Sequence, residues 1–127
     1  MEANILVVED EKGIRDAITI YLKNQGYHVY EAENGAQGLE MVENHTIHLA
    51  IVDIMMPVMD GLEATRHIRS MSRRDAMTIP IVAMSANAFQ EDVEKSLAAG
   101  LNEHLTKPLD EKKLTETMKK YLGNKMR

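Results

Sequence analysis

The chain contains no cysteine and no tryptophan, and only 4% of its residues are aromatic. Without cysteine it can form neither disulfides nor thiolate metal sites. No apolar run approaches the roughly 18 residues that a membrane-spanning helix requires. Residues 1–4 lack the basic start and the long apolar stretch of a signal peptide. These absences predict a cytoplasmic protein with no membrane partner.

Basic residues are too few to favour a polyanionic partner. The chain has 15 Lys and Arg against 20 Asp and Glu, which gives a net charge of -5 at pH 7. Nucleic acids and anionic membranes bind basic surfaces, so direct binding to either is not expected. A length of 127 residues, 44% of them hydrophobic, suffices for one domain with a core of its own. We therefore expect a single domain over residues 1–127.

Short apolar runs alternate along the chain with segments of helical periodicity. Asn4–Val8 is apolar and rich in β-branched side chains, which is typical of a strand buried on both faces. The predicted strands are Asn4–Val8, His28–Ala32, Leu49–Val52, Ile79–Met84 and Glu103–Thr106. The first predicted helix follows Glu11 and stops at Gly26, and the second follows the Asn34 cap, with Gln37 in a capping box. The next two cover Gly61–Met71 and Gln90–Ala99, and the last runs from the Asp110 cap to Leu122.

This alternation predicts a parallel sheet with helices on both faces. The fold class is therefore α/β, a doubly wound five-stranded parallel sheet in a flavodoxin-like three-layer (βα)5 sandwich. The strand order expected for this class is 2-1-3-4-5, counted along the chain. Functional groups in such sheets gather at the carboxyl ends of the strands.

Chemically active residues follow four of the predicted strands. Glu9 and Asp10 follow the first, Asp53 the third, Ser85 the fourth, and Lys107 the fifth. Because the expected order makes the first and third strands neighbours, the three carboxylates should converge. Ser85 and Lys107 should then flank them.

Three converging carboxylates repel one another by roughly 4 kcal/mol per pair at about 4 Å and an effective dielectric constant near 20. Lys107 offsets one of these charges, and a divalent cation would offset the rest. All-oxygen ligands favour Mg²⁺ or Mn²⁺. Asp53 would then be an oxygen nucleophile beside a Lewis acid, a lysine and a hydroxyl, which are the groups that phosphoryl transfer requires.

Other interpretations of these residues remain open at this point. An acid after a strand is a common turn former or helix cap, and Ser85 or the dipeptide Lys107–Pro108 would be unremarkable alone. A flavodoxin-like or nucleotide-binding protein would hold phosphate with backbone amides after the first strand, but Glu9–Gly13 is acidic and would repel it. A phosphatase with an aspartyl nucleophile would need a cap or substrate pocket, for which the chain offers no segment.

From about Asn4 to Leu122 the sequence resembles the receiver domain of two-component signalling, found in response regulators and hybrid histidine kinases. The motifs that carry the resemblance are VVEDE at 7–11, VDIMMP at 52–57, MDG at 59–61, MSA at 84–86 and TKP at 106–108. The part up to Asp53 is most similar to receivers of transcriptional regulators, and the part from Met59 to receivers of hybrid sensor kinases. The resemblance implies a phosphorylation-activated switch rather than a classical enzyme.

The resemblance also implies roles for individual residues around the metal. Asp53 would accept a phosphoryl group from the phosphohistidine of a sensor histidine kinase or a histidine phosphotransfer protein. Asp10, Asp53 and the backbone carbonyl of Met55 would coordinate Mg²⁺, with Glu9 acting directly or through water. Met55 and Asn87 would tune the lifetime of the acyl phosphate.

The switch residues follow from the same resemblance. Lys107 would contact the phosphoryl group, and its peptide bond to Pro108 is typically cis in the family. The hydroxyl of Ser85 would move to a phosphoryl oxygen on activation. The activated surface, formed by the fourth helix, fifth strand and fifth helix, would bind an output partner or a second copy of the chain.

One position departs from the family pattern. Three residues before the lysine many members carry Tyr or Phe, whose rotamer is coupled to the hydroxyl, but this chain has His104. Imidazole titrates near neutral pH, so His104 could make the output face pH-sensitive; the alternative is an ordinary half-exposed strand histidine. No effector domain is expected after the last helix, so the chain acts alone or belongs to a larger protein.

Overall fold

The computed structural model describes residues 3–53, 61–71, 78–85, 100–106 and 109–123. The strands are β1 (Asn4–Val8), β2 (His28–Ala32), β3 (Leu49–Asp53), β4 (Ile81–Ser85) and β5 (Glu103–Thr106). The described helices are α1 (Lys12–Asn24), α2 (Gly35–Asn44), α3 (Gly61–Arg69) and α5 (Glu111–Leu122). The predicted helix Gln90–Ala99 lies outside the described residues.

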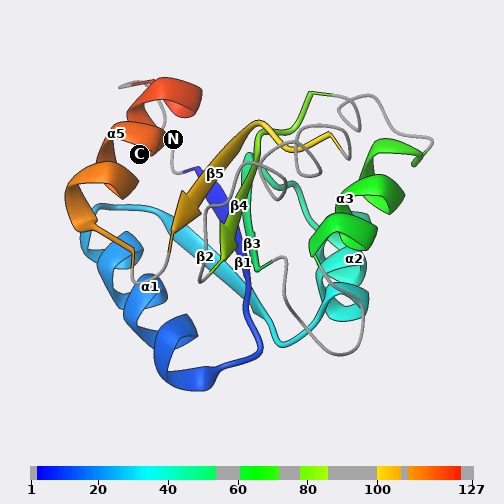
Figure 1. The fold of residues 1–127 in the computed structure, drawn as a ribbon, viewed down its shortest axis with the longest axis horizontal. Helices are drawn as coiled ribbons and strands as arrows, with labels where there is room; N and C mark the ends of the chain where they lie inside the picture. The colour runs from blue at the N-terminus through cyan, green and yellow to red at the C-terminus, as the bar shows by residue number, and fades with distance from the viewer. Residues whose placement is uncertain (1–2, 54–60, 72–77, 86–99, 107–108, 124–127) are drawn as a thin grey trace.

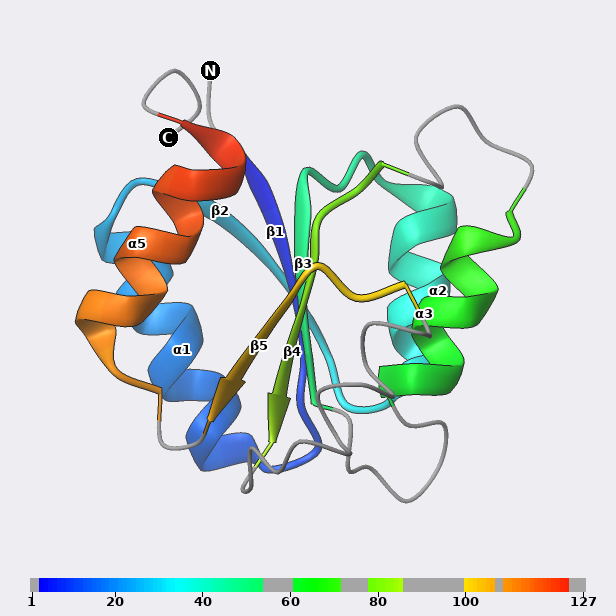
Figure 2. The same ribbon diagram turned by 45° about the horizontal axis from the view of Figure 1, so that its top comes forward.

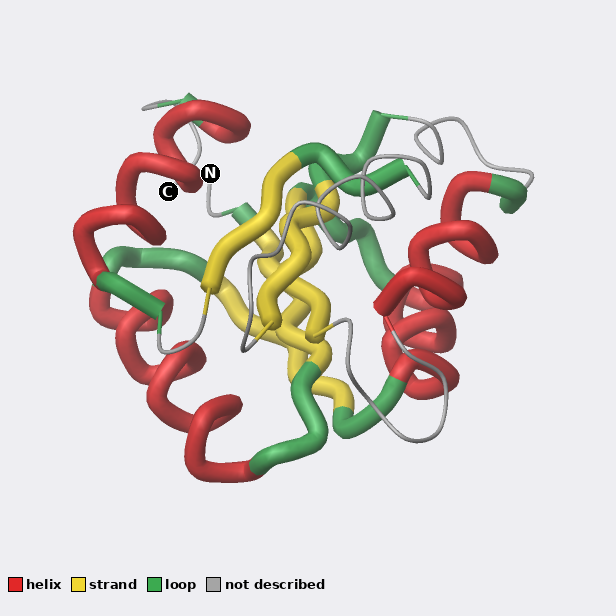
Figure 3. The backbone as a smooth tube through the Cα atoms, in the orientation of Figure 1, coloured by secondary structure: helices red, strands yellow, loops and turns green. Residues whose placement is uncertain are grey.

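The strands form one parallel sheet in the order β2-β1-β3-β4-β5, which confirms the predicted fold class. Helices cover both faces of the sheet (Figure 1). Helices α1 and α5 lie on one side and α2 and α3 on the other, as the turned view makes clear (Figure 2). The strands therefore form the middle of three layers (Figure 3).

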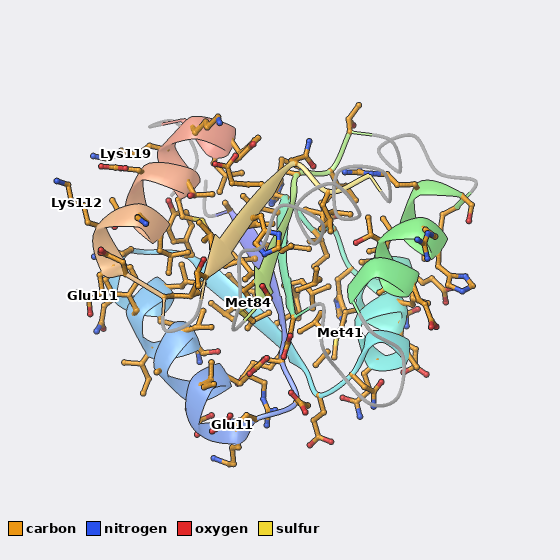
Figure 4. The ribbon with its side chains drawn as sticks, viewed as in Figure 1. Glu11, Met41, Met84, Glu111, Lys112 and Lys119 are labelled. Atoms are coloured by element: carbon orange, nitrogen blue, oxygen red, sulfur yellow. The ribbon has the colours of Figure 1, made fainter. Side chains whose placement is uncertain are left out.

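The continuous apolar runs of the strands are explained by burial on both faces of the sheet. Successive side chains of a strand point to opposite faces. In β1, Leu6 and Val8 pack with the α2–α3 layer, while Ile5 and Val7 pack with the α1–α5 layer. Met84 of β4 is fully buried within the second cluster, whereas the charged side chains of α5 point outward (Figure 4).

The predicted helix caps are confirmed. The backbone N–H of Gln37 donates to Oδ1 of Asn34 at 2.9 Å, and Oε1 of Gln37 accepts from the N–H of Glu33 at 2.9 Å. The side chain of Gln37 thus reaches the residue before the cap, one position earlier than in an ordinary capping box. At α5, Oδ1 of Asp110 accepts from the N–H of Lys112 at 2.8 Å.

Three predicted boundaries were wrong by one or two residues. Strand β3 extends to Asp53, which pairs with Met84. Strand β4 begins at Ile81 rather than Ile79, because Pro80 has no N–H to donate to a ladder and the carbonyl of Ile79 accepts from Arg69 instead. Strand β4 ends at Ser85 rather than Met84.

Helix α3 also ends earlier than predicted, at Arg69 rather than Met71. The N–H of Met71 bonds to the carbonyl of Ile68, a tight turn that closes the helix. Among the described residues, no helix is both long and apolar enough to cross a bilayer.

Candidate functional site

The carboxyl ends of β1, β3, β4 and β5 lie at one edge of the parallel sheet, the lower edge in Figure 2. Val8 of β1 is paired with Val52 of β3, so the residues that follow them, Glu9 and Asp53, come side by side. Ser85 is the last residue of β4 and pairs with Thr106 of β5. The parallel ladder therefore brings together residues that are far apart in the sequence, as the strand order predicted.

The acidic residues form a compact cluster. One carboxylate oxygen from each of Glu9, Asp10 and Asp53 lies within 4.8 Å of the others. Glu9 is fully buried and Asp53 is 2% exposed, while Asp10 faces solvent. Asp10 is therefore the solvent-exposed member of the cluster.

The spacing of these carboxylates suits a shared cation. At about 5 Å and an effective dielectric constant near 20, each pair of negative charges costs roughly 3 kcal/mol. A divalent cation bound by all three would convert that repulsion into attraction, and ligand sets made only of oxygen prefer Mg²⁺, Mn²⁺ or Ca²⁺. The donor set of this site thus fits the metal that the sequence predicted.

Ser85 and His104 are linked by a hydrogen bond. The hydroxyl of Ser85, a residue that is 3% exposed, lies 2.8 Å from Nε2 of His104. The two residues stand on neighbouring strands, because His104 pairs with Ala83, two positions before Ser85. His104 is half-buried and borders a cavity of about 440 Å³ between β5 and α5. The hydroxyl at the end of β4 is therefore linked to a residue of the edge strand β5 that borders this cavity.

Sequence reasoning missed one residue of this region, Arg15 of α1. Its guanidinium is buried, and Nη1 donates to the backbone carbonyl of Glu9 at 2.8 Å. A signal was present, since Arg15 lies three residues before Ile18 and one after Ile14, within the apolar stripe of an amphipathic helix. A charged residue in such a stripe indicates a buried polar contact.

Several predicted site residues lie outside the described residues: Met55, Asn87, Lys107 and Pro108. Their roles in metal binding, acyl-phosphate lifetime, phosphoryl contact and the cis peptide stay predictions. The described part of the predicted site consists of Glu9, Asp10, Asp53, Ser85 and His104.

Comparison with known proteins agrees with this geometry. The model of the response regulator receiver domain family matches residues 5–119. A probable transcriptional regulatory protein of Picosynechococcus sp. is 40% identical over 120 residues, which cover 89% of this chain and 46% of that protein. The chain thus spans less than half the length of this relative.

Solved structures show the same similarity. The receiver domain of the sensor histidine kinase PA1611 from Pseudomonas aeruginosa, described with a magnesium ion coordinated in the active site cleft, superposes with a TM-score of 0.88 at 33% identity, covering 98% of this chain and 100% of that one. A chain of the co-crystal structure of the Saccharomyces cerevisiae histidine phosphotransfer protein Ypd1 with the receiver domain of Ssk1 gives a TM-score of 0.85 at 27% identity, covering 94% and 88%.

Proposed function

The chain belongs to the response regulator receiver family of two-component, phosphorylation-dependent signalling, and from this premise we propose that Asp53 is its phosphoacceptor. The observation that carries the proposal is the burial of Asp53 at the end of β3, within 4.8 Å of two other carboxylates. A buried carboxylate beside two others destabilises the folded protein unless a cation binds at the same site. Residues 1–127 are proposed to form one receiver domain.

Glu9, Asp10 and Asp53 would hold Mg²⁺ or Mn²⁺, with the backbone carbonyl of Met55 as the further ligand predicted from the family motif. The described carboxylates support this assignment by their spacing and their chemistry. When bound, the ion would supply neutralisation of the charge on the phosphoryl oxygens. The PA1611 receiver, which shares the fold, is described with magnesium in its active site cleft.

In the proposed reaction a carboxylate oxygen of Asp53 attacks the phosphorus of a phosphohistidine in line. The new O–P bond forms as the N–P bond breaks, and the imidazole nitrogen of the donor keeps the electron pair. The ammonium group of Lys107 would pair with a phosphoryl oxygen. The same groups would assist the later hydrolysis of the acyl phosphate, so the chain takes part in its own dephosphorylation without acting on an external substrate.

The hydrogen bond between Ser85 and His104 suggests how the phosphoryl group would be detected. A phosphoryl oxygen on Asp53 would attract the hydroxyl of Ser85 away from Nε2 of His104. His104 would then reposition on β5, next to the cavity that α5 borders. The surface of the fourth predicted helix, β5 and α5 would change between two packed arrangements. An output partner or a second copy of the chain would bind the phosphorylated arrangement.

The proposed phosphoryl donor is a sensor histidine kinase or a histidine phosphotransfer protein. Support comes from the similarity to a receiver domain solved together with the phosphotransfer protein Ypd1.

The test is incorporation of acid-labile phosphate from acetyl phosphate with Mg²⁺ present. We expect the wild type to be labelled and Asp53→Asn to lose the label. Asp16→Asn is the matched control, because Asp16 lies on α1 and pairs only with exposed Lys12 in the described structure, at 2.6 Å. Stoichiometric labelling of Asp53→Asn would overturn the assignment.

A further inference from the structure

The turn between β1 and α1 supplies two of the three clustered carboxylates, and its backbone is held from both sides. The N–H of Glu9 donates to the carbonyl of Ala32 in β2 at 3.0 Å. The carbonyl of Glu9 accepts from Nη1 of Arg15 at 2.8 Å. The backbone of Glu9 is thus held by β2 through its N–H and by α1 through its carbonyl.

Arg15 is itself fixed in place. It is 9% exposed, in the first turns of α1, and its N–H donates to the carbonyl of Glu11 at 3.0 Å. Its Nε lies 3.5 Å from Oε1 of Glu31, an exposed residue of β2. The planar guanidinium can make these two contacts at once, which an ammonium group cannot do in the same geometry. Arg15 therefore connects α1, the β1–α1 turn and β2.

We propose that Arg15 is a positioning residue for the acidic cluster. By holding the carbonyl of Glu9, it fixes the direction in which the chain leaves β1, and with it the carboxylates of Glu9 and Asp10. The inference rests on the proposed function, because it assumes that the cluster binds a divalent cation. Groups that hold a metal-ligating residue in place commonly change metal affinity by about 10- to 100-fold.

A purely electrostatic role for Arg15 predicts the opposite sign. A buried positive charge near a cation site weakens cation binding, so its removal would tighten Mg²⁺ binding. A positioning role predicts weaker binding, because the carboxylates lose their arrangement. A purely structural role predicts lower stability with unchanged Mg²⁺ affinity. These three roles can therefore be separated by one titration.

The experiment measures the dissociation constant of Mg²⁺ by isothermal titration calorimetry for the wild type and for Arg15→Met, Arg15→Lys and Glu31→Gln. Arg66→Met is the matched control, because Arg66 is an exposed arginine on α3 and its loss changes the net charge equally. Circular dichroism and thermal melting without metal establish that each variant is folded. The amide signals of Asp10 and Glu11 in ¹⁵N NMR report the β1–α1 turn directly, without metal.

We expect Arg15→Met to raise the dissociation constant by about tenfold and to shift the Asp10 and Glu11 amide signals. Arg15→Lys and Glu31→Gln should each raise it by a smaller factor, and Arg66→Met should leave it unchanged. Should Arg15→Met fail to fold, Arg15→Lys, which retains the positive charge, decides in its place by whether the dissociation constant of Mg²⁺ rises.

Unchanged or tighter Mg²⁺ binding in the folded Arg15 variant would overturn the inference while leaving the proposed function intact. Absence of Mg²⁺ binding in the wild type would overturn the proposed metal site and this inference together. The two failures are thus distinguished by the wild-type titration.

Discussion

The hydroxyl of Ser85 and Nε2 of His104 lie 2.8 Å apart, and this contact joins the end of β4 to the edge strand β5. Ser85 is almost fully buried at the end of β4 and follows Met84, the strand partner of Asp53, while His104 borders the cavity between β5 and α5. A hydrogen bond of this kind contributes about 1 kcal/mol net. That is enough to bias an equilibrium between two arrangements roughly fivefold.

His104→Leu should release the Ser85 hydroxyl from its partner on β5. We expect phosphorylation of Asp53 to persist and the equilibrium of the unphosphorylated protein to shift about fivefold toward the activated arrangement. The measurement is the NMR shift change of β5 and α5 signals on adding beryllofluoride, a phosphoryl mimic. His67→Leu, an exposed histidine on α3, is the control. Beryllofluoride-induced changes equal to those of the wild type would contradict the coupling. The pH response of the β5 and α5 surface through His104 stays a prediction. The same NMR signals, followed through neutral pH, would test it.

Magnesium should stabilise the folded protein, because the unfolded chain has no carboxylate cluster. At a free Mg²⁺ concentration about 100 times its dissociation constant, the expected gain is about 2.7 kcal/mol in the free energy of unfolding. Asp10→Asn should weaken Mg²⁺ binding at least about tenfold, or 1.4 kcal/mol.

The neighbouring Glu11→Gln serves as the control for Asp10→Asn, because Glu11 is exposed and its side chain makes no cap hydrogen bond. Thermal melting with Mg²⁺ and with a chelator measures both effects. Equal Mg²⁺ stabilisation of Asp10→Asn and Glu11→Gln would argue against Asp10 as a ligand.

Arg69 should be a major stabilising residue at the end of α3. Its guanidinium donates to the carbonyl of Gly100 from Nε and Nη2 at 3.1 and 2.7 Å, to the carbonyl of Ile79 at 2.8 Å and to Oδ1 of Asn102 at 2.8 Å. Partial burial lowers the pKa of Arg69 from its ordinary value, but a guanidinium stays charged near neutral pH.

Arg69→Met would remove this donor from the carbonyls of Gly100 and Ile79, whereas Oδ1 of Asn102 would keep the N–H of Ile81. We expect a loss of roughly 2–3 kcal/mol in the free energy of unfolding. Arg66→Met, on the exposed side of the same helix, should change it by less than about 0.5 kcal/mol. Urea unfolding of the two variants provides the comparison. Similar midpoints for both would show that the contacts of Arg69 add little.

Tyr121 should make stability depend on alkaline pH. Burial raises the pKa of its phenol above the ordinary value of 10.0, and a 2.8 Å hydrogen bond to Glu103 adds to the rise. A hydrogen bond to Glu103 likewise raises the pKa of Lys120. Both groups bind their protons more tightly in the folded state, so their contribution is complete below the ordinary pKa and is lost as the pH rises through the raised value.

Tyr121→Phe should therefore cost about 1 kcal/mol at neutral pH and should show a smaller decline of stability above pH 10.0 than the wild type. Tyr30→Phe, in the ring that stacks on His45, is the control. Urea unfolding on both sides of pH 10.0 measures the difference. Parallel pH profiles for the wild type and Tyr121→Phe would refute the assignment.

The sequence predicted the fold well because the strands are buried on both faces. Continuous apolar runs such as Leu49–Val52 are buried on both faces when helices cover both sides of the sheet. The alternation of strands and helices then limits the possible strand orders. The caps Asn34 and Asp110 were predictable because their side chains bond to nearby backbone groups. The start of β4 was not, because the carbonyl of Ile79 is taken by Arg69 from another helix.

The site was predictable as far as it depends on strand ends. Glu9, Asp10 and Asp53 converge because parallel strands end at the same edge. The apolar stripe of α1 indicated a buried contact for Arg15, but its partner was not predictable, because a backbone carbonyl is present at every residue. The sequence placed His104 in the switch through its position before the lysine, but the contact with Ser85 depends on strand register.

The central claim is that Asp53 carries the phosphoryl group, and locating the modified residue tests it most directly. The protein is phosphorylated with Mg²⁺ and acetyl phosphate and then reduced with borohydride, which converts an aspartyl phosphate to homoserine. Peptide mass spectrometry then finds the converted residue. We predict homoserine at position 53 in the wild type. Homoserine at position 10, or acid-stable phosphate on a serine or threonine with Asp53 unchanged, would contradict the account.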